Sequence, residues 1–460
     1  MKQGNKMGLG LTAAVLLCAA GFLQSKIDPQ RAQYAPGDRH AGKAATVLPI
    51  EFALGAMTGF REAIAGLLWV RVDQFFHEGD YGAITPLIRI ITWLDPHNTD
   101  VYQTGAWHMD YNFTDESQRS DRRYIPLAIA LMREGIANNP DNPDMYADLA
   151  FTHYFRKIAD FHKSQEYFDA GQKAMLRVQE ASKQDPNNAG LKAEAQKAAL
   201  DVTTVGHGLA HAYEALGMIP EAEAQWEWCI KNHEANIANG FGKDFGERSS
   251  LQVAQRILKE MQMRYNYRKD LDKDQHDMQF TAKLKRIASG VFVLTGTMNV
   301  EGAKNFVLET GKKTWAPTDG ARVEIRLQDA GYKMTELTSF SLNSLHLKAS
   351  TTIMQDAASV RDGKYSKKLD MSKDPSIYSF AAPEYEMIVW FNPSNPNDSP
   401  PQVQDRIGWL GQGMTDKNYL DTTGVVPGDT VKPVTGLRQI KKVFKLTRED
   451  IIGKDEKTFE

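Results

Sequence analysis

The sequence is poor in cysteine and carries no excess of charge of either sign. Its two cysteines, Cys18 and Cys229, are far apart, and Cys18 lies in an apolar N-terminal run, so we expect no internal disulfide. The 55 basic and 58 acidic residues give a formal net charge of −3. This balance lacks the electrostatic footprint of a nucleic-acid-binding protein, and it gives no attraction to anionic lipid.

Sequence motifs for phosphate binding and nucleophilic catalysis are also missing. There is no P-loop, no G-x-G-x-x-G after a predicted strand, no G-x-S-x-G elbow and no C-x-x-C pair. These are the common motifs of nucleotide-dependent, hydrolytic and thiol–disulfide enzymes. We therefore predict a non-catalytic protein with no cofactor and no nucleic-acid partner.

The first 25 residues, in contrast, have the composition of a targeting segment. Lys2 and Lys6 precede an uncharged apolar run of 17 residues, Met7 to Leu23. That length is the lower limit for crossing a hydrocarbon core of about 30 Å. A cleaved signal peptide and a retained membrane anchor both remain open for residues 1–25, with a lipoprotein or a buried helix as further alternatives. We predict a protein of the cell envelope outside the cytoplasm, with residues 26–50 as a linker.

Hydrophobic periodicity divides the rest of the chain into two regions, as the length of 460 residues leads us to expect. Residues 51–244 show long helical patterns, and the charged, amphipathic residues 245–288 are typical of capping helices. In residues 289–450, short stretches of alternating polarity such as YEMIVWFNP are separated by turn sequences. We predict a multidomain fold: an all-α region, then an all-β antiparallel sandwich, then a tail, residues 451–460.

The helical region contains an internal repeat. Three predicted helix ends share a proline and neighbouring Asp or Asn residues, at Pro96, Pro140 and Pro186, with spacings of 44 and 46 residues. Proline stops one helix and sets the turn into the next. The spacing is long enough for a helical hairpin with a lengthened inner loop.

The residues before these prolines resemble the tetratricopeptide repeat, a helical hairpin of roughly 34 residues. The best-matching unit has its first-helix positions at Leu209, Ala210 and Tyr213, its turn at Gly217, and its second-helix positions at Ala222, Trp226 and Cys229. It departs from the family pattern at Gly206 and Glu234. Four units are identified over residues 65–236, and the middle two carry extra residues between their helices. The resemblance implies an all-α solenoid in which each unit buries its apolar face only by stacking on a neighbour.

In tetratricopeptide proteins the first helices line a concave groove, so the resemblance also implies a binding surface. The corresponding stripe is Trp69, Asp73 and Phe76 in the first unit, Gln103, Trp107 and Asp110 in the second, Phe151 and Tyr154 in the third, and His207, His211 and Glu214 in the fourth. Exposed aromatic side chains favour binding because they bury a large area at low entropic cost. The acids among them would prefer a basic partner group. The alternative is that other parts of the chain cover these aromatics.

His207, His211 and Glu214 allow a second interpretation. Spacings of four and three residues place them on one helix face, where two histidines could hold a metal ion. However, HGLAH lacks the glutamate of H-E-x-x-H, so no general base is supplied. We expect groove surface here and predict no metal.

These features predict a non-catalytic scaffold that binds a protein or peptide partner in the groove. The N-terminal segment would provide contact with a membrane, and a homo-oligomer is left open. Two alternatives remain: a structural subunit of an envelope or surface assembly, and a metal-dependent binder or enzyme that uses His207 and His211.

Overall fold

The structure is a computed structural model that describes residues 61–112, 124–241, 246–267, 275–300, 306–307, 314–332, 352–372, 382–427 and 432–460. The predicted targeting segment and linker, residues 1–50, lie outside these ranges. Within the described ranges, no helix has the length and apolar character needed to cross a membrane.

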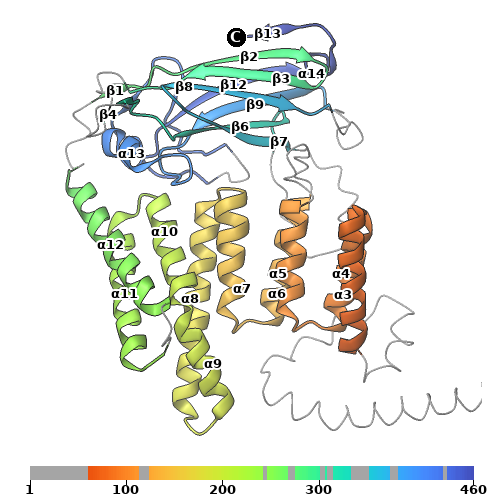
Figure 1. Cartoon of the computed structure of the whole chain (residues 1–460), viewed down its shortest axis with the longest axis vertical. Coiled ribbons are helices and arrows are strands. Elements are labelled where there is room, and N and C mark those ends of the chain that lie inside the picture. Colours follow the sequence, from red (N-terminus) through yellow and green to blue (C-terminus); the bar gives the residue numbers. More distant parts are fainter. Residues whose placement is uncertain are drawn as a thin grey trace, which may run out of the picture.

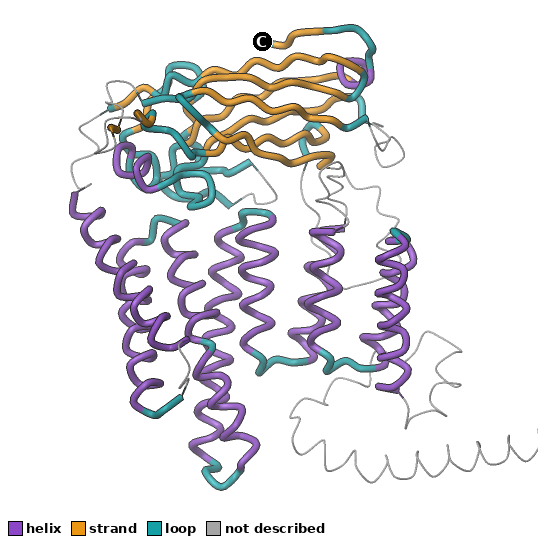
Figure 2. Tube along the Cα trace, viewed as in Figure 1, coloured by secondary structure: helices purple, strands orange, loops and turns teal. Residues whose placement is uncertain are grey.

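The predicted order of the two regions is confirmed, because helices come first along the chain and antiparallel sheets follow. Helices and strands gather in separate parts of the molecule (Figure 2). The helices stand side by side below the sheets, and α9 projects downward at the end of the helical region away from them (Figure 1). They are α3 Arg61–Glu78, α4 Tyr81–Leu94, α5 Thr99–Trp107, α6 Ile125–Asn138, α7 Pro143–Asp148, α8 Phe161–Gln184, α9 Ala189–Leu200, α10 His207–Ala215, α11 Ile219–Ala238 and α12 Gly246–Tyr267.

Three π-helical segments interrupt this regular pattern. They are η1 His108–Asn112, η3 Leu149–Lys157 and η4 Val202–Gly206. η1 continues α5, η3 continues α7, and η4 leads into α10. A π-helix has more residues per turn than an α-helix, so each segment rotates the side chains that follow it relative to α-helical spacing.

The repeated proline punctuation has the local effect that the sequence predicts. α4, α6 and α8 each end two residues before Pro96, Pro140 and Pro186. The asparagine after the second and third of these prolines caps the next helix. Asn142 accepts a hydrogen bond from the Asp144 amide at 3.1 Å, and Asn188 accepts one from the Leu191 amide at 3.1 Å. Each bond satisfies an amide that a helix start leaves without a partner.

The sheets form two layers around one apolar core. One sheet has the strand order β11-β12-β9-β6-β7 and the other β13-β2-β3-β8, and all pairs in both are antiparallel. Their strands are β2 Thr281–Ala288, β3 Val291–Thr297, β6 Arg322–Asp329, β7 Thr352–Ser359, β8 Lys364–Asp370, β9 Glu384–Phe391, β11 Leu420–Asp421, β12 Gln439–Thr447 and β13 Lys457–Phe459. Two short pairs complete the described strands: β1 His276–Asp277 with β10 Met414–Thr415, and β4 Phe306–Val307 with β5 Thr314–Trp315.

Two predicted boundaries are wrong. Residues 245–288 are not all capping helices: α12 ends at Tyr267, and β2 already occupies Thr281–Ala288. Alternate residues of β2 are buried, which is strand periodicity, but the buried Arg286 disguises it in the sequence. The predicted tail, residues 451–460, also contains a strand, because β13 pairs with β2 and extends the four-stranded sheet.

The helical region and the β region are joined through the loop that follows helix α13, Pro401–Ile407. The indole Nε1–H of Trp409 donates to the backbone carbonyl oxygen of Glu214 at the end of α10. Next to it, Leu410 packs on Gly217, whose φ of 69° closes the turn between α10 and α11. An apolar cluster that includes Phe155, Leu216 and Leu437 continues the contact.

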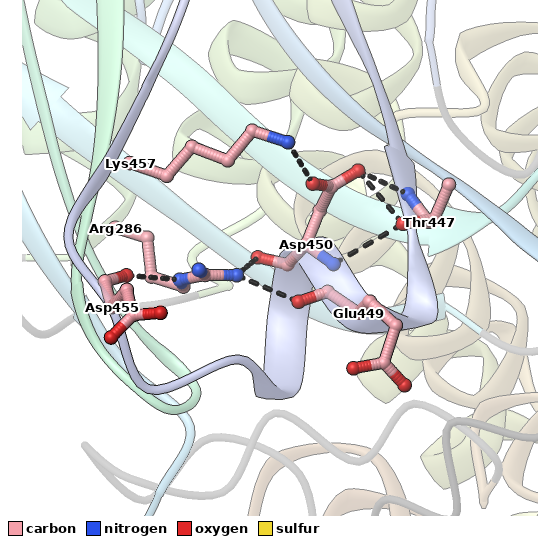
Figure 3. Close-up of polar contacts among 6 residues, drawn as sticks. All are labelled: Arg286, Thr447, Glu449, Asp450, Asp455 and Lys457. Atoms are coloured by element: carbon pink, nitrogen blue, oxygen red, sulfur yellow. Dashed lines mark hydrogen bonds and ion pairs between the residues drawn. The ribbon is translucent and has the colours of Figure 1, made fainter.

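Buried Arg286 ties the C-terminal end of the chain to β2 (Figure 3). Its guanidinium donates to the backbone carbonyl oxygens of Glu449, Asp450 and Asp455 at 2.7, 2.8 and 2.9 Å. Glu449 and Asp450 belong to α14, Arg448–Ile452, so Arg286 adds a charged donor to carbonyl groups of this short helix.

We predict that Arg286→Leu lowers the free energy of unfolding of the β region by about 3 kcal/mol, because three hydrogen bonds from a buried, charged donor are lost. The control is Lys285→Ala on the same strand, which removes an exposed ion pair with Glu456 at 2.6 Å and costs no more than about 1 kcal/mol. Denaturant unfolding measures both, and equal losses in the two variants would refute the assigned role of Arg286.

Candidate functional site

An open groove of about 910 Å³ lies on the helical region. Its walls come from three successive segments: α5 with η1, α7 with η3, and η4 with α10. Two large aromatic side chains stand on it, with Trp107 44% exposed and Phe151 42% exposed. A hollow lined by half-exposed aromatics is the usual composition of a site that buries apolar groups of a ligand.

Five of the eleven predicted stripe residues line this groove. They are Gln103, Trp107, Phe151, His207 and His211. Three others are buried instead, which corrects their prediction as groove surface. Asp110 and Glu214 are held by hydrogen bonds inside the protein, and Tyr154 stacks on the ring of Tyr167 at 5.4 Å.

The first-unit residues lie outside the groove. Trp69 and Phe76 are partly buried against the N-terminal helical core. Asp73 is exposed and lies 3.6 Å from His77 on its own helix, α3. The groove therefore spans the second to fourth predicted units, and the first unit does not contribute to it.

The π-helical segments explain why some predicted residues line the groove and others are buried. With α-helical spacing, Asp110 and Tyr154 would follow Trp107 and Phe151 on one face. In η1 and η3 the wider turns rotate these two residues inward and bring Tyr111 and Arg156 onto the wall. Sequence periodicity missed five residues of the groove wall: Tyr111, Asp144, Asp148, Thr152 and Arg156. Tyr111 lies four residues after Trp107, and Arg156 lies five residues after Phe151, so a search at these spacings would have found both.

Carboxylates and one arginine set the charge of the wall. Asp144 and Asp148 both line the groove, and Asp148 accepts a hydrogen bond from the Thr152 hydroxyl at 2.6 Å. Arg156 lies over the Phe151 ring at 5.7 Å. Behind the wall, burial and the neighbouring Asp144 carboxyl raise the pKa of Asp201 to about 7. These groups make the wall a mixture of aromatic surface and hydrogen-bond acceptors.

A buried charge pair joins two of the groove segments from behind. Asp110 Oδ2 of η1 lies 2.5 Å from His153 Nδ1 of η3, and neither side chain is exposed. Burial by itself lowers the pKa of His153. The charge of Asp110 and its hydrogen bond outweigh burial, so the net shift of the His153 pKa is upward.

The two histidines that the alternative interpretation treats as metal ligands have protein partners. His207 Nε2 lies 2.9 Å from His233 Nε2, and His211 Nδ1 lies 3.3 Å from Glu214 Oε2. The other oxygen of Glu214 accepts from Trp226 Nε1 at 2.6 Å. Among the residues that the structure describes, no group of three or more His, Cys, Asp or Glu side chains is arranged to hold a metal ion.

Comparison with known proteins gives no relative: no family model, no curated protein and no solved structure matches this chain.

We predict that Asp110→Asn lowers the free energy of unfolding of the helical region by about 3–5 kcal/mol, because it leaves His153 buried without its counter-charge. Removing both partners in Asp110→Leu/His153→Leu should recover much of that loss. Thermal melts followed by circular dichroism measure both, and an Asp110→Asn protein as stable as wild type would contradict the pair.

The same pair predicts a pH dependence. The folded-state pKa of His153 is raised above its unfolded value near 6.5. Its contribution is therefore complete below about pH 6.5 and is lost as pH rises through the folded-state pKa. Melts across neutral to alkaline pH should show this loss in wild type and not in Asp110→Leu/His153→Leu. Parallel curves for the two proteins would contradict it.

Proposed function

We propose that the chain is a non-catalytic scaffold that holds a peptide segment of a partner protein in the groove. The observation that carries this proposal is the pair Trp107 and Phe151. Their side chains remain 44% and 42% exposed in a groove of about 910 Å³. Other large aromatics of neighbouring helices, Trp226 and Phe168, are fully buried. Exposure of two large apolar rings to water is unfavourable in free energy, and binding of a partner would bury them.

The proposal includes a tetratricopeptide type for the helical region. Consecutive helices pack as pairs, α3 with α4, α5 with α6 and α10 with α11, and the groove is walled by the first member of successive pairs. A groove of this kind takes an extended or helical segment through a few apolar anchors, with polar groups to fix its register. The predicted N-terminal segment would place the scaffold in the cell envelope.

We predict that Trp107→Ala and Phe151→Ala each weaken peptide binding at least about tenfold, because central aromatic anchors carry most of the energy of such interfaces. The probe is a peptide selected from a random twelve-residue phage library on the immobilised full chain in detergent. Fluorescence anisotropy of the labelled peptide gives the Kd.

The matched control is Leu67→Ala on α3, which removes an apolar side chain that is 72% exposed and lies outside the groove. Its affinity should equal that of wild type. Peptides that bind all four proteins equally, or a library that yields no binder, would overturn the proposed function.

A further inference from the structure

Three buried side chains from three helices form one hydrogen-bonded chain that ends at the groove. The Oε2 atom of Glu247 on α12 lies 2.8 Å from Nδ1 of His233 on α11. His233 Nε2 lies 2.9 Å from His207 Nε2 of α10. His207 lines the groove, whereas His233 and Glu247 lie behind its wall. No sequence motif predicts this arrangement, because 26 residues separate the two histidines and 14 separate His233 from Glu247.

The Glu247 carboxylate, at one end of this series of hydrogen bonds, determines which nitrogen of each histidine carries the proton. A carboxylate only accepts, so His233 must carry its proton on Nδ1 and donate it to Glu247. Neutral His233 then has a lone pair on Nε2, and His207 donates its Nε2 proton there. The second nitrogen of His207, Nδ1, is left as an acceptor. It has no hydrogen-bond partner among the described residues and is not fully enclosed.

Two features of the structure lie beside the Glu247 carboxylate. Glu247 lies in the first turn of α12, where the helix dipole favours an anion. The Asn236 amide donates to the same Oε2 atom at 3.3 Å and is itself fixed by the Ala199 carbonyl oxygen at 2.6 Å. The carboxylate can therefore keep its role as terminal acceptor of the chain.

The charged and aromatic groups of the groove wall favour a ligand whose hydrogen-bond donor is positively charged. Burial, followed by the nearby His233 and His211, lowers the pKa of His207 to about 3, so His207 stays neutral and does not repel a positive group. Asp144 and Asp148 line the same groove, and the faces of aromatic rings attract cations. The basic groups of the wall, Arg156 and His211, are engaged with Phe151 and Glu214.

We propose that His207 is the hydrogen-bond acceptor of the groove, oriented by the positioning residues His233 and Glu247, and that it selects partner segments with a basic side chain. This inference rests on the proposed function, because it names the chemistry of the segment that the groove holds. A lysine or arginine would donate to His207 Nδ1 while its aliphatic part packs on the aromatic wall.

The first experiment needs no ligand. Nitrogen-15 NMR of histidine-labelled full chain in detergent should find His207 neutral at pH 7 with its proton on Nε2. Glu247→Gln retains an acceptor and should keep this tautomer, whereas Glu247→Leu removes the acceptor and should shift it. A His207 protonated on Nδ1 in wild type and in Glu247→Gln would overturn the proposal, even if Glu247→Leu fails to fold.

The second experiment uses the random twelve-residue phage library. Wild type and Glu247→Gln should enrich lysine or arginine in the selected peptides, and substitution of that residue by norleucine or citrulline should weaken binding at least about tenfold. The variant His207→Phe should lose the basic preference and keep the apolar one. Selected peptides without a basic residue would overturn this inference and leave the proposed function standing, whereas no selected peptide at all would remove both.

Discussion

The helical region depends on a few helix contacts that only glycine permits. A Cβ atom on Gly208 would lie 2.1 Å from Cε1 of Phe168, and one on Gly135 would lie 2.4 Å from Cε of Met145. Glycine inside a helix costs about 1 kcal/mol relative to alanine. Full burial of a Phe or Met side chain returns roughly 1.5–3 kcal/mol, so the close approach is favourable overall. These contacts hold neighbouring helices at the spacing that makes three of them share one wall.

The architecture is largely readable from the sequence because it follows from patterns that repeat. Proline with a capping asparagine marks the helix ends, and small residues with aromatic knobs mark the packed faces. Alternating polarity marks most of the strands. The sequence misplaces the start of the β region because Arg286 occupies a buried strand position. Its three carbonyl partners come from the far end of the chain, and no local pattern reveals them.

The candidate site is only partly readable, and the reason is geometric. Trp107, His207 and His211 lie in α-helical segments and Phe151 near the start of η3, and all four line the groove. Asp110 and Tyr154 lie within π-helical turns, whose wider spacing places them in the interior. Propensity and periodicity carry little information about a π-helix. The chain from His207 to Glu247 is equally invisible, since it joins three helices.

The groove is also connected to the β region, because Trp409 bonds to Glu214 at the end of the helix that carries His207 and His211. The central claim is that a partner segment contacts the wall formed by the second to fourth helix pairs. Fluorine NMR of the chain labelled with 5-fluorotryptophan, titrated with a library-selected peptide, tests it most directly. The account predicts that the Trp107 resonance shifts while that of Trp69 on the first pair does not. Shifts confined to Trp69 or to tryptophans of the β region would contradict it.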